Sequence, residues 1–357
     1  MKLDRRTLSL SLAALLPGGL HLLRPLAQGA QGAAVTLTDV DGLAVGHRTR
    51  DERPTGCTVV LTPSGATGGV AIRGAAPGTR ETALLDPTAS VDVVHAIVLS
   101  GGSAFGLATA DGVMRWLRER GHGFPTDGGV VPIVPAAILY DLGLGGDATP
   151  DGDDGYRACE AASDGPVESG SIGAGAGATV GKMFGAGAMK GGIGSAGFRF
   201  DDGTVVAALI AVNCRGDIRD PATGRLVAGA RTPDGAALRD TERTLLAGNA
   251  ATEAQVGANT TIGVVATNRT LDKAQCNRLA SVAHDGLARA IVPAHTRWDG
   301  DTLFTLATNT LPAPEETRMH DLLDVAAAAA VASAILDAVG AATGLEGLPS
   351  ARDLGNL

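Results

Sequence analysis

Residue types that mark several common functional classes are scarce in this sequence. Phe, Trp and Tyr together make up 3% of its 357 residues, and no stripe of interleaved basic and aromatic residues appears. The formal net charge is −9, so the chain also lacks the positive charge that favours binding to a phosphate backbone. We therefore expect no nucleic-acid partner.

Cysteine is equally sparse, and its four positions are far apart: Cys57, Cys159, Cys214 and Cys276. The absence of a Cys-x-x-Cys pair and of a His-rich cluster argues against a zinc or redox centre. The sequence thus predicts neither a metal nor a cofactor. A disulfide and four buried free thiols both fit these positions, and the spacing does not select a pair.

No permanent membrane span is expected, although the N-terminal segment contains a short apolar run. Paired Arg5 and Arg6 precede this run over residues 8–16, and small residues follow near 27–33. That order is typical of a bacterial secretory signal, and the paired arginines suggest the twin-arginine type. The run is too short to remain in a bilayer as a helix. We expect residues 1–33 to be a signal peptide and the mature protein to be periplasmic or secreted.

The chain is rich in apolar side chains and in glycine. Hydrophobic residues make up 45% of it, and the 51 glycines are spread among apolar runs rather than gathered in a linker. This composition is typical of a globular protein with many tight turns and close backbone approaches. The length allows one large or two ordinary domains, and no domain boundary is evident, so we treat residues 34–357 as a single domain.

Periodicity predicts a mixture of strands and helices without strict alternation. The expected strands cover Cys57–Leu61, Val93–Leu99, Val130–Val134, Thr204–Asn213, Thr260–Thr267 and Thr302–Thr308. The expected helices cover Ser103–Arg120, Tyr156–Ala162, Asp240–Ala247, Leu271–Ala290 and Met319–Ala342. We interpret residues 144–157 and 215–237 as surface loops. This mixture favours a layered α/β or α+β domain over a barrel.

Two glycine-rich stretches resemble known motifs incompletely. "LSGGSAFGLATADG" follows a strand and opens a helix, but Phe105 stands where a nucleophile elbow around Ser103 needs glycine. "GAGAGATVGKMFG" places Lys182 after a glycine, but Ala176 and Met183 break the phosphate-loop pattern. What remains is a strand-to-helix turn that can line a pocket, and a lysine in a crowded loop that can supply charge to a site.

Two acidic stretches raise separate questions. "DGDDG" at Asp151 hints at a calcium loop, but Ala162 replaces its terminal glutamate, so we interpret it as a solvated acidic loop. In "HTRWDGDTLFTLAT", Asp299 and Asp301 flank a glycine and lead into a strand. Asp-Gly favours a plain turn. Two adjacent carboxylates at the mouth of a strand can also raise one another's pKa, which makes one of them a proton carrier.

The stretch "GANTTIGVVATN" begins a β-branched strand with two hydroxyl side chains, Thr260 and Thr261. The hydroxyls are either a polar strand end or include a nucleophile held on rigid structure. Threonine suits strands in any case, so the local pattern alone does not decide between these interpretations.

Several motifs in order decide the question by resemblance. "GANTTIGVVATN" followed by "WDGDTLF" resembles the self-cleaving N-terminal-nucleophile hydrolases, a family that includes L-aminopeptidase/D-esterases, β-peptidyl aminopeptidases and the nylon-oligomer hydrolase. Further matches are "RGAAPGTRETALLDP", "VLSGGSAFGLATADGV", "PAAILYDL", "GAGAGATVGK" and "KGGIGSAG". The resemblance covers the chain from about Val35 to the C-terminus.

The resemblance implies a fold and a processing event. The family folds as a four-layer αββα sandwich, and its members are usually tetramers. The precursor cuts itself before a Ser or Thr, which here implies cleavage between Asn259 and Thr260. A large subunit of residues 34–259 and a small subunit of residues 260–357 would result, and Thr260 would be the nucleophile.

The resemblance also implies a set of site residues. Lys182 and Asn213 match positions near the nucleophile, and we take the Asn213 amide as the candidate oxyanion donor. Asp299 and Asp301 match positions that support cleavage and catalysis. Tyr140 matches a tyrosine of the substrate pocket, to which we also assign Ser103 in the neighbouring glycine-rich turn. "AVNCRGD" is a loose match, which weakens the expected surroundings of Asn213.

The resulting hypothesis is an exported aminopeptidase or amidase that acts on short peptides or peptide-like amides through an acyl-enzyme. Three alternatives remain open at this point. The first is an acyltransferase like the related-fold ornithine acetyltransferases, in which an amine resolves the acyl-enzyme. The second is a non-catalytic binding protein that keeps the fold. The third is hydrolysis by Ser103 with a distant Asp and His295. Substrate identity does not carry over from the family.

Overall fold

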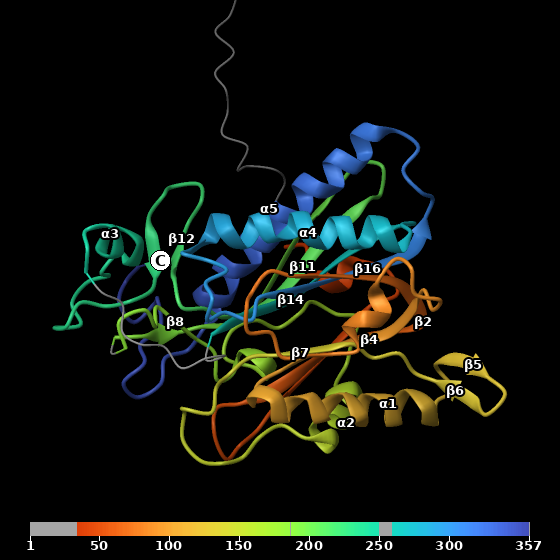
Figure 1. The fold of residues 1–357 in the computed structure, drawn as a ribbon, viewed down its shortest axis with the longest axis horizontal. Helices are drawn as coiled ribbons and strands as arrows, with labels where there is room; N and C mark the ends of the chain where they lie inside the picture. The colour runs from red at the N-terminus through yellow and green to blue at the C-terminus, as the bar shows by residue number, and fades with distance from the viewer. Residues whose placement is uncertain (1–33, 186, 250–258, 357) are drawn as a thin grey trace, which may run out of the picture. The chain divides into compact units, whose positions relative to one another are not determined.

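A computed structural model describes residues 34–185, 187–249 and 259–356, so the expected signal peptide lies outside the described residues. Its largest sheet follows the order β10-β11-β14-β16-β2-β4-β7-β3, with β1 paired to β2 (Figure 1). These strands are β1 (Ala44–Thr49), β2 (Gly56–Ile72), β3 (Thr79–Arg80), β4 (Val93–Ser100), β7 (Ala136–Ile138), β10 (Gly192–Arg199), β11 (Val205–Asn213), β14 (Thr260–Arg269) and β16 (Thr302–Leu311).

The helices and the short strands complete the described structure. The helices are α1 (Thr109–Glu119), α2 (Gly152–Glu160), α3 (Thr241–Leu246), α4 (Lys273–Ala290) and α5 (Thr317–Ala341). Short 3-10 turns cover Leu37–Asp39, Thr82–Leu85, Ser103–Ala108 and Gly173–Gly175. The short strands are β5 (Phe124–Thr126), β6 (Gly129–Val131), β8 (Thr179–Val180), β9 (Met189–Lys190), β12 (Asp217–Arg219), β13 (Leu226–Ala228) and β15 (Ile291–Val292).

Strand β2 is long enough to belong to two halves of the sheet. Its first part, up to Leu61, pairs with β1 and β4, and its last part, from Thr67, pairs with β16. The register against β4 shifts between Leu61 and Ala66, where the strand changes from one half to the other. One continuous hydrogen-bonded ladder therefore supplies two sheet layers.

Three separate apolar cores show that these layers stack with helices outside them. One core lies between the β11–β14–β16 half and helices α4 and α5, and another lies between β2–β4 and helices α1 and α2. The third joins inward side chains of β4 with those of β11, β14 and β16. Three buried interfaces require four layers, and Figure 1 shows α4 and α5 on the opposite side of the strands from α1 and α2. The expected αββα sandwich is confirmed.

Local sequence explains how the outer layers form. Asp272 caps α4 by accepting the N–H of Gln275, and Gln275 returns the bond in a capping box. The alanine-rich α5 approaches β10 closely: a Cβ on Gly194 would lie 2.2 Å from the Ala338 nitrogen. Glycines in "KGGIGSAG" thus allow backbone-to-backbone packing. Helix α5 is long and apolar enough to cross a membrane, but 61% of its most apolar window is buried inside the protein.

Several expected elements differ in the structure. The strand expected at Val130–Val134 is wrong, because β6 ends at Val131 and β7 starts at Ala136. Pro132 and Pro135 stand between them and lack the N–H that a continuous ladder needs. The helix expected from Ser103 begins as a 3-10 turn, and α1 starts at Thr109. All four cysteines are buried free thiols.

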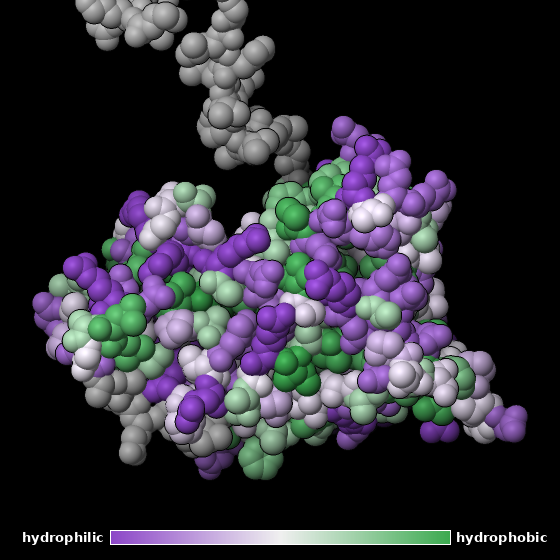
Figure 2. Space-filling view, turned by 45° about the horizontal axis from the view of Figure 1, so that its top comes forward, coloured by the Kyte–Doolittle hydropathy of each residue, from purple (hydrophilic) through white to green (hydrophobic). Residues whose placement is uncertain are grey.

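Both expected surface loops contain regular structure. The acidic stretch 151–154 begins helix α2, because the Asp151 side chain accepts the N–H groups of Asp153 and Asp154. Asp154 itself is buried rather than solvated. Residues 215–237 include β12 and β13, and Asp217 is buried there. The sequence-only interpretation failed at these places because long-range partners cover the polar residues. The surface in Figure 2 intersperses hydrophilic and hydrophobic residues.

Candidate active site

Three neighbouring strands bring the expected site residues to one end of the sheet. Thr260 is the first residue of β14 and lies opposite Asn213, the last residue of antiparallel β11. On its other side β14 runs parallel to β16, which starts at Thr302 directly after Asp301. The end of one strand and the starts of two others therefore meet at Thr260.

The Thr260 hydroxyl contacts the peptide bond that precedes it. The residue is 1% exposed, and its Oγ1 donates to the carbonyl oxygen of Asn259 at 2.5 Å. The same carbonyl oxygen accepts the backbone N–H of Gly300 at 3.0 Å. Asn259 is also buried and forms a parallel bridge with Asp299. The Asn259 carbonyl oxygen thus accepts two hydrogen bonds, and the one from Thr260 holds the hydroxyl next to the Asn259–Thr260 peptide bond.

Asn213 and Lys182 form a polar pair beside Thr260. The Lys182 Nζ donates to the Asn213 side-chain oxygen at 2.8 Å and to its main-chain oxygen at 3.1 Å. The Asn213 Oδ1 also accepts the N–H of Thr179 at 3.0 Å, and its Nδ2 donates to the Tyr140 carbonyl at 3.0 Å. These contacts fix the plane of the Asn213 amide.

Burial changes the proton affinity of Lys182. Desolvation of the ammonium lowers its pKa to about 8, and the carboxylates of Asp299 and Asp141 oppose part of that change. Near neutral pH the group is still mainly a cation. It therefore places a positive charge next to Asn213 and in the field of Asp299.

Asp301 is fully engaged in hydrogen bonds. Its Oδ1 accepts the N–H of Thr261 at 2.7 Å. Its Oδ2 accepts the backbone N–H of His295 at 3.1 Å and lies 2.7 Å from the His295 Nδ1. His295 adopts a left-handed backbone with φ of 53°, which lets its backbone nitrogen and its ring Nδ1 face the same carboxylate oxygen. Asp301 thereby ties the start of β14 to the turn before β16.

Asp299 is buried with less support. Its Oδ2 accepts the N–H of Thr296 at 2.8 Å, but its Oδ1 has no hydrogen-bond partner among the described residues. Burial and then the nearby charge of Asp301 raise the pKa of this carboxyl, the Thr296 hydrogen bonds and Lys182 oppose the change, and the net pKa is about 6. Asp299 therefore exchanges a proton near neutral pH, as expected of the more poorly solvated member of a carboxylate pair.

The expected pocket residues lie next to this cluster. The Tyr140 carbonyl contacts Asn213, and the Ser103 N–H donates to the carbonyl of Leu139 at 3.0 Å. Asp141 fastens this region, because its carboxylate accepts the Gly102 N–H and pairs with buried Arg53, both at 2.9 Å.

Ser103 is not joined to His295 in the part of the chain that the structure describes. The His295 ring instead pairs with Asp301, and its centroid lies 4.9 Å from that of His284. The hydrogen bond between Ser103 and His295 that such a triad needs is therefore absent from the described residues.

Other polar residues took positions that sequence reasoning missed. Gly300 and the support of Asp301 by His295 were not expected, although both flank the "DGD" stretch. Lys273 and His284 are polar residues of α4, and both are buried. Lys273 donates to three backbone carbonyls and His284 lies 2.9 Å from the Ala71 oxygen. Among the described residues, no group of three potential metal ligands occurs.

Comparison with known proteins agrees with this geometry. The model of peptidase family S58 matches residues 36–352. This chain belongs to peptidase family S58. It is 45% identical over 343 residues to an uncharacterised aminopeptidase of Mycobacterium tuberculosis, covering 89% of this chain and 97% of the relative. It is 32% identical to a 6-aminohexanoate-oligomer endohydrolase of a Kocuria species, covering 84% of each chain.

Solved structures support the fold of this S58 member. A β-aminopeptidase of a Burkholderia species superposes with a TM-score of 0.68 at 25% identity, covering 93% of this chain and 96% of the other. The L-aminopeptidase D-Ala-esterase/amidase of Ochrobactrum anthropi, described as a variant of the Ntn-hydrolase fold, gives 0.64 at 22% identity, covering 88% and 89%. The chain is an enzyme, an aminopeptidase or amidohydrolase with the N-terminal-nucleophile hydrolase fold.

Proposed function

We propose that this enzyme cuts its own chain before Thr260 and then uses that residue as an N-terminal nucleophile. The observation that carries the proposal is the contact between the Thr260 hydroxyl and the carbonyl of Asn259. A threonine hydroxyl is a weak nucleophile and needs an adjacent base. Asp299 supplies one, since its backbone is bridged to Asn259 and its pKa lies near 6.

Self-cleavage proceeds as an N-to-O acyl shift. As Asp299 accepts the hydroxyl proton, the Thr260 Oγ bonds to the Asn259 carbonyl carbon and the C=O electron pair moves to oxygen. Collapse of this intermediate breaks the C–N bond, and the leaving nitrogen takes a proton. Water then hydrolyses the ester, which leaves a carboxylate on Asn259 and restores the hydroxyl of Thr260.

The new chain end changes the base available to Thr260. A free α-amine has a pKa of about 7.7–8.0, and the positive charge of Lys182 lowers it further. The amine then accepts the proton of its own residue's hydroxyl. Thr260 attacks the substrate carbonyl, the amine product leaves, and water hydrolyses the acyl-enzyme. The Asn213 amide, held beside Thr260, donates to the substrate oxyanion.

The substrate class is short peptides or peptide-like amides with a free amino group. Two relatives are named for an oligomer endohydrolase and a β-aminopeptidase activity. In this chain Asp299 provides a buried carboxylate at the site, which favours a substrate ammonium over an acidic group. Exo-action at an amino terminus follows from that preference.

Intact-mass analysis of the purified protein, with sequencing of the small fragment, tests the proposal. We expect a fragment that begins Thr-Thr-Ile-Gly, and activity on aminoacyl amides that appears only with the fragment. Thr260→Ala should remain uncut and inactive, whereas Thr260→Ser should be cut. Thr261→Ala is the matched control, since Thr261 is equally buried and adjacent, and it should still be cut. An active chain that is unbroken through residue 260 would refute the proposal.

Export and self-association belong to the same proposal. The paired Arg5 and Arg6 before an apolar run support twin-arginine export, so changing both to lysine should keep the protein in the cytoplasm on cell fractionation. The family resemblance supports a homotetramer. A native mass of one chain equivalent in solution would contradict that part.

A further inference from the structure

We infer that the backbone N–H of Gly300 is the oxyanion donor of self-cleavage. This inference rests on the proposed function, because it concerns the acyl shift before Thr260. The N–H donates to the carbonyl oxygen of Asn259 at 3.0 Å, and that oxygen gains the negative charge when Thr260 attacks. A donor that already points at this oxygen loses no free energy to reorganisation as the charge develops.

The second donor to the same oxygen does not survive the attack. In the ground state the Thr260 hydroxyl also donates to the Asn259 carbonyl. When Oγ bonds to the carbonyl carbon, its proton passes to the base, so this hydrogen bond disappears as the oxyanion forms. Among the described residues, the Gly300 N–H is the donor that remains hydrogen-bonded to that oxygen.

A segment distant in sequence holds the Gly300 amide in place. The Asp301 carbonyl accepts the N–H groups of Arg73 and Gly74 at 3.0 and 3.2 Å, and the Asp299 carbonyl accepts that of Ala76 at 2.9 Å. A Cβ on Gly74 would lie 2.3 Å from the Asp299 oxygen and the Asp301 nitrogen. Glycine at 74 therefore allows the two backbones to touch, and the Ala76 N–H fixes the peptide unit that carries the Gly300 N–H, because that unit includes the Asp299 carbonyl.

Asn213 occupies a different place and serves the other reaction. Its Nδ2 donates to the Tyr140 carbonyl, and its Oδ1 accepts from Thr179 and Lys182. In this scheme self-cleavage and substrate turnover use different donors, Gly300 for the first and Asn213 for the second.

A side-chain substitution at position 300 does not isolate the N–H. A Cβ there would lie 2.6 Å from the Ala76 oxygen and 2.9 Å from the Thr260 Oγ1, so alanine would also displace the nucleophile. Replacing Gly300 by glycolic acid, introduced by nonsense suppression during cell-free synthesis of the full chain, converts the amide to an ester. This change removes the donor and leaves the backbone shape nearly unchanged.

The test measures the rate of cutting before residue 260 on denaturing gels. We expect the Gly300 ester to slow cleavage by about 100- to 1,000-fold, the usual effect of removing one oxyanion donor. The matched control is an ester at Gly203, whose N–H also makes one backbone hydrogen bond, 2.9 Å from the Phe200 oxygen in a remote turn. It should be cut at the rate of the unmodified chain.

Two results would overturn the inference: slowing of less than about 10-fold by the Gly300 ester, or equal slowing by the Gly203 ester. Gly74→Ala provides a second variant made only of natural residues. It keeps the Gly300 N–H but moves the peptides that aim it, so cleavage should slow by about 10-fold or more while the protein still melts cooperatively, and an unchanged rate would contradict the inference. Cutting of Thr260→Ala at the same bond would instead refute the proposed function.

Discussion

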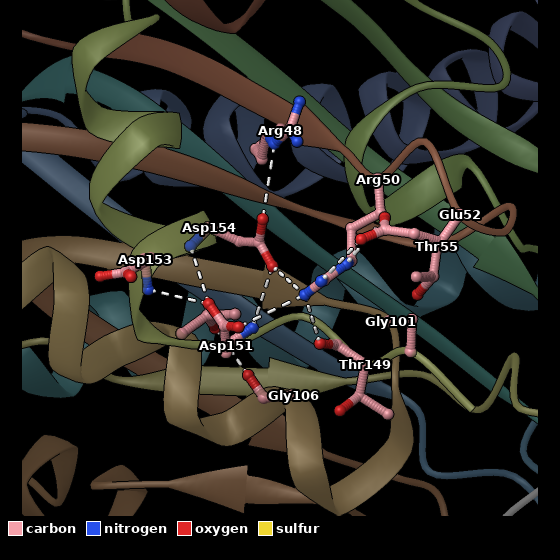
Figure 3. A network of polar contacts seen from close by, with 12 residues as sticks. Arg48, Arg50, Glu52, Thr55, Gly101, Gly106, Thr149, Asp151, Asp153 and Asp154 are labelled. Carbon is pink, nitrogen blue, oxygen red and sulfur yellow. Dashed lines mark hydrogen bonds and ion pairs between the residues drawn. The ribbon is translucent and has the colours of Figure 1, made fainter. Parts of the chain in front are cut away.

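Two Asp-Gly-Asp stretches in this protein share a sequence but have different chemistry. Asp151 to Asp153 begins helix α2, and Figure 3 shows it and Asp154 within a network of arginines. Asp154 accepts from Arg50 at 2.8 Å and from Arg48 at 3.4 Å, and the Asp151 carboxylate caps the helix. Every acid in this network has a cation or a backbone N–H as partner.

At Asp299 to Asp301 the buried carboxylates have fewer hydrogen-bonding and charged partners. His295 and the Thr261 N–H hold Asp301, but Asp299 accepts one described N–H and has a buried oxygen without a described partner. Its pKa is raised accordingly. The difference teaches that the partners of an acidic stretch, rather than its residues, decide whether it stabilises the fold or exchanges protons.

Asp299→Asn should slow self-cleavage more than any other substitution in the two stretches. It removes the base but keeps the shape and the acceptor for Thr296, so self-cleavage should slow by about 10²–10⁴-fold. Asp151→Asn, in the other stretch, keeps a good helix cap and should be cut normally. Time courses on denaturing gels measure both, and normal cutting of Asp299→Asn would remove Asp299 from the mechanism.

The two stretches should also differ in how stability depends on pH. The folded pKa of Asp299 is raised from 3.8 to about 6, so the unfolded chain loses its proton first as pH rises. Ionisation of Asp299 therefore lowers the free energy of unfolding progressively between pH 4 and 6, by about 2–3 kcal/mol in total.

Urea unfolding measures this difference in uncut chains. Thr260→Ala provides an uncut background, and Asp299→Asn added to it should gain relative stability from pH 4 to pH 7. Asp151→Asn in the same background should show no such gain. A stability difference that stays constant over this range would mean that the carboxyl titrates normally.

Asp154→Ala should cost stability without affecting cleavage. It leaves Arg48 and Arg50 without their buried carboxylate, but both side chains retain some contact with water, so we expect a loss of about 2 kcal/mol. Asp153→Ala breaks an exposed pair with Arg115 and should cost less than about 0.5 kcal/mol. Urea unfolding at pH 7 compares the two, and equal losses would argue against a buried network.

His295→Ala should have a smaller effect at the active site. It removes the ring nitrogen that holds Asp301 but keeps the backbone N–H, so self-cleavage should slow by about 10-fold. His295→Asn tolerates the left-handed backbone and can still donate to Asp301, so it should recover part of the rate. The pH profile of cleavage distinguishes this role from simple destabilisation, since it should shift in the alanine variant alone.

The sequence predicted the site residues that lie at the ends of strands. Thr260 and Asn213 each terminate a β-branched run, and the resemblance placed them together. The four-layer fold followed in the same way. The expected strand boundaries were wrong where Pro132 and Pro135 interrupt an apolar run.

The partners of the acidic residues were beyond sequence reasoning. Arg48 and Arg50 reach Asp154 only because β1 and the start of α2 are packed together, and nothing near "DGDDG" indicates them. Likewise, the direction of the Gly300 N–H is set by residues 73–76, which lie far away along the chain. Backbone donors have no side-chain signature, so only a structure reveals them.

The position of β14 within the ladder has a mechanical consequence. Strands β14 and β16 lie side by side, with β11 on one flank and β2 on the other. A chain cut before Thr260 would have strands β14 and β16 of its shorter piece paired between strands of the longer piece, and its short strand β15 paired with β12 of the longer piece. The two pieces would then separate only if these three rows of backbone hydrogen bonds broke, so the nick would release a reactive end without loosening the protein that carries it.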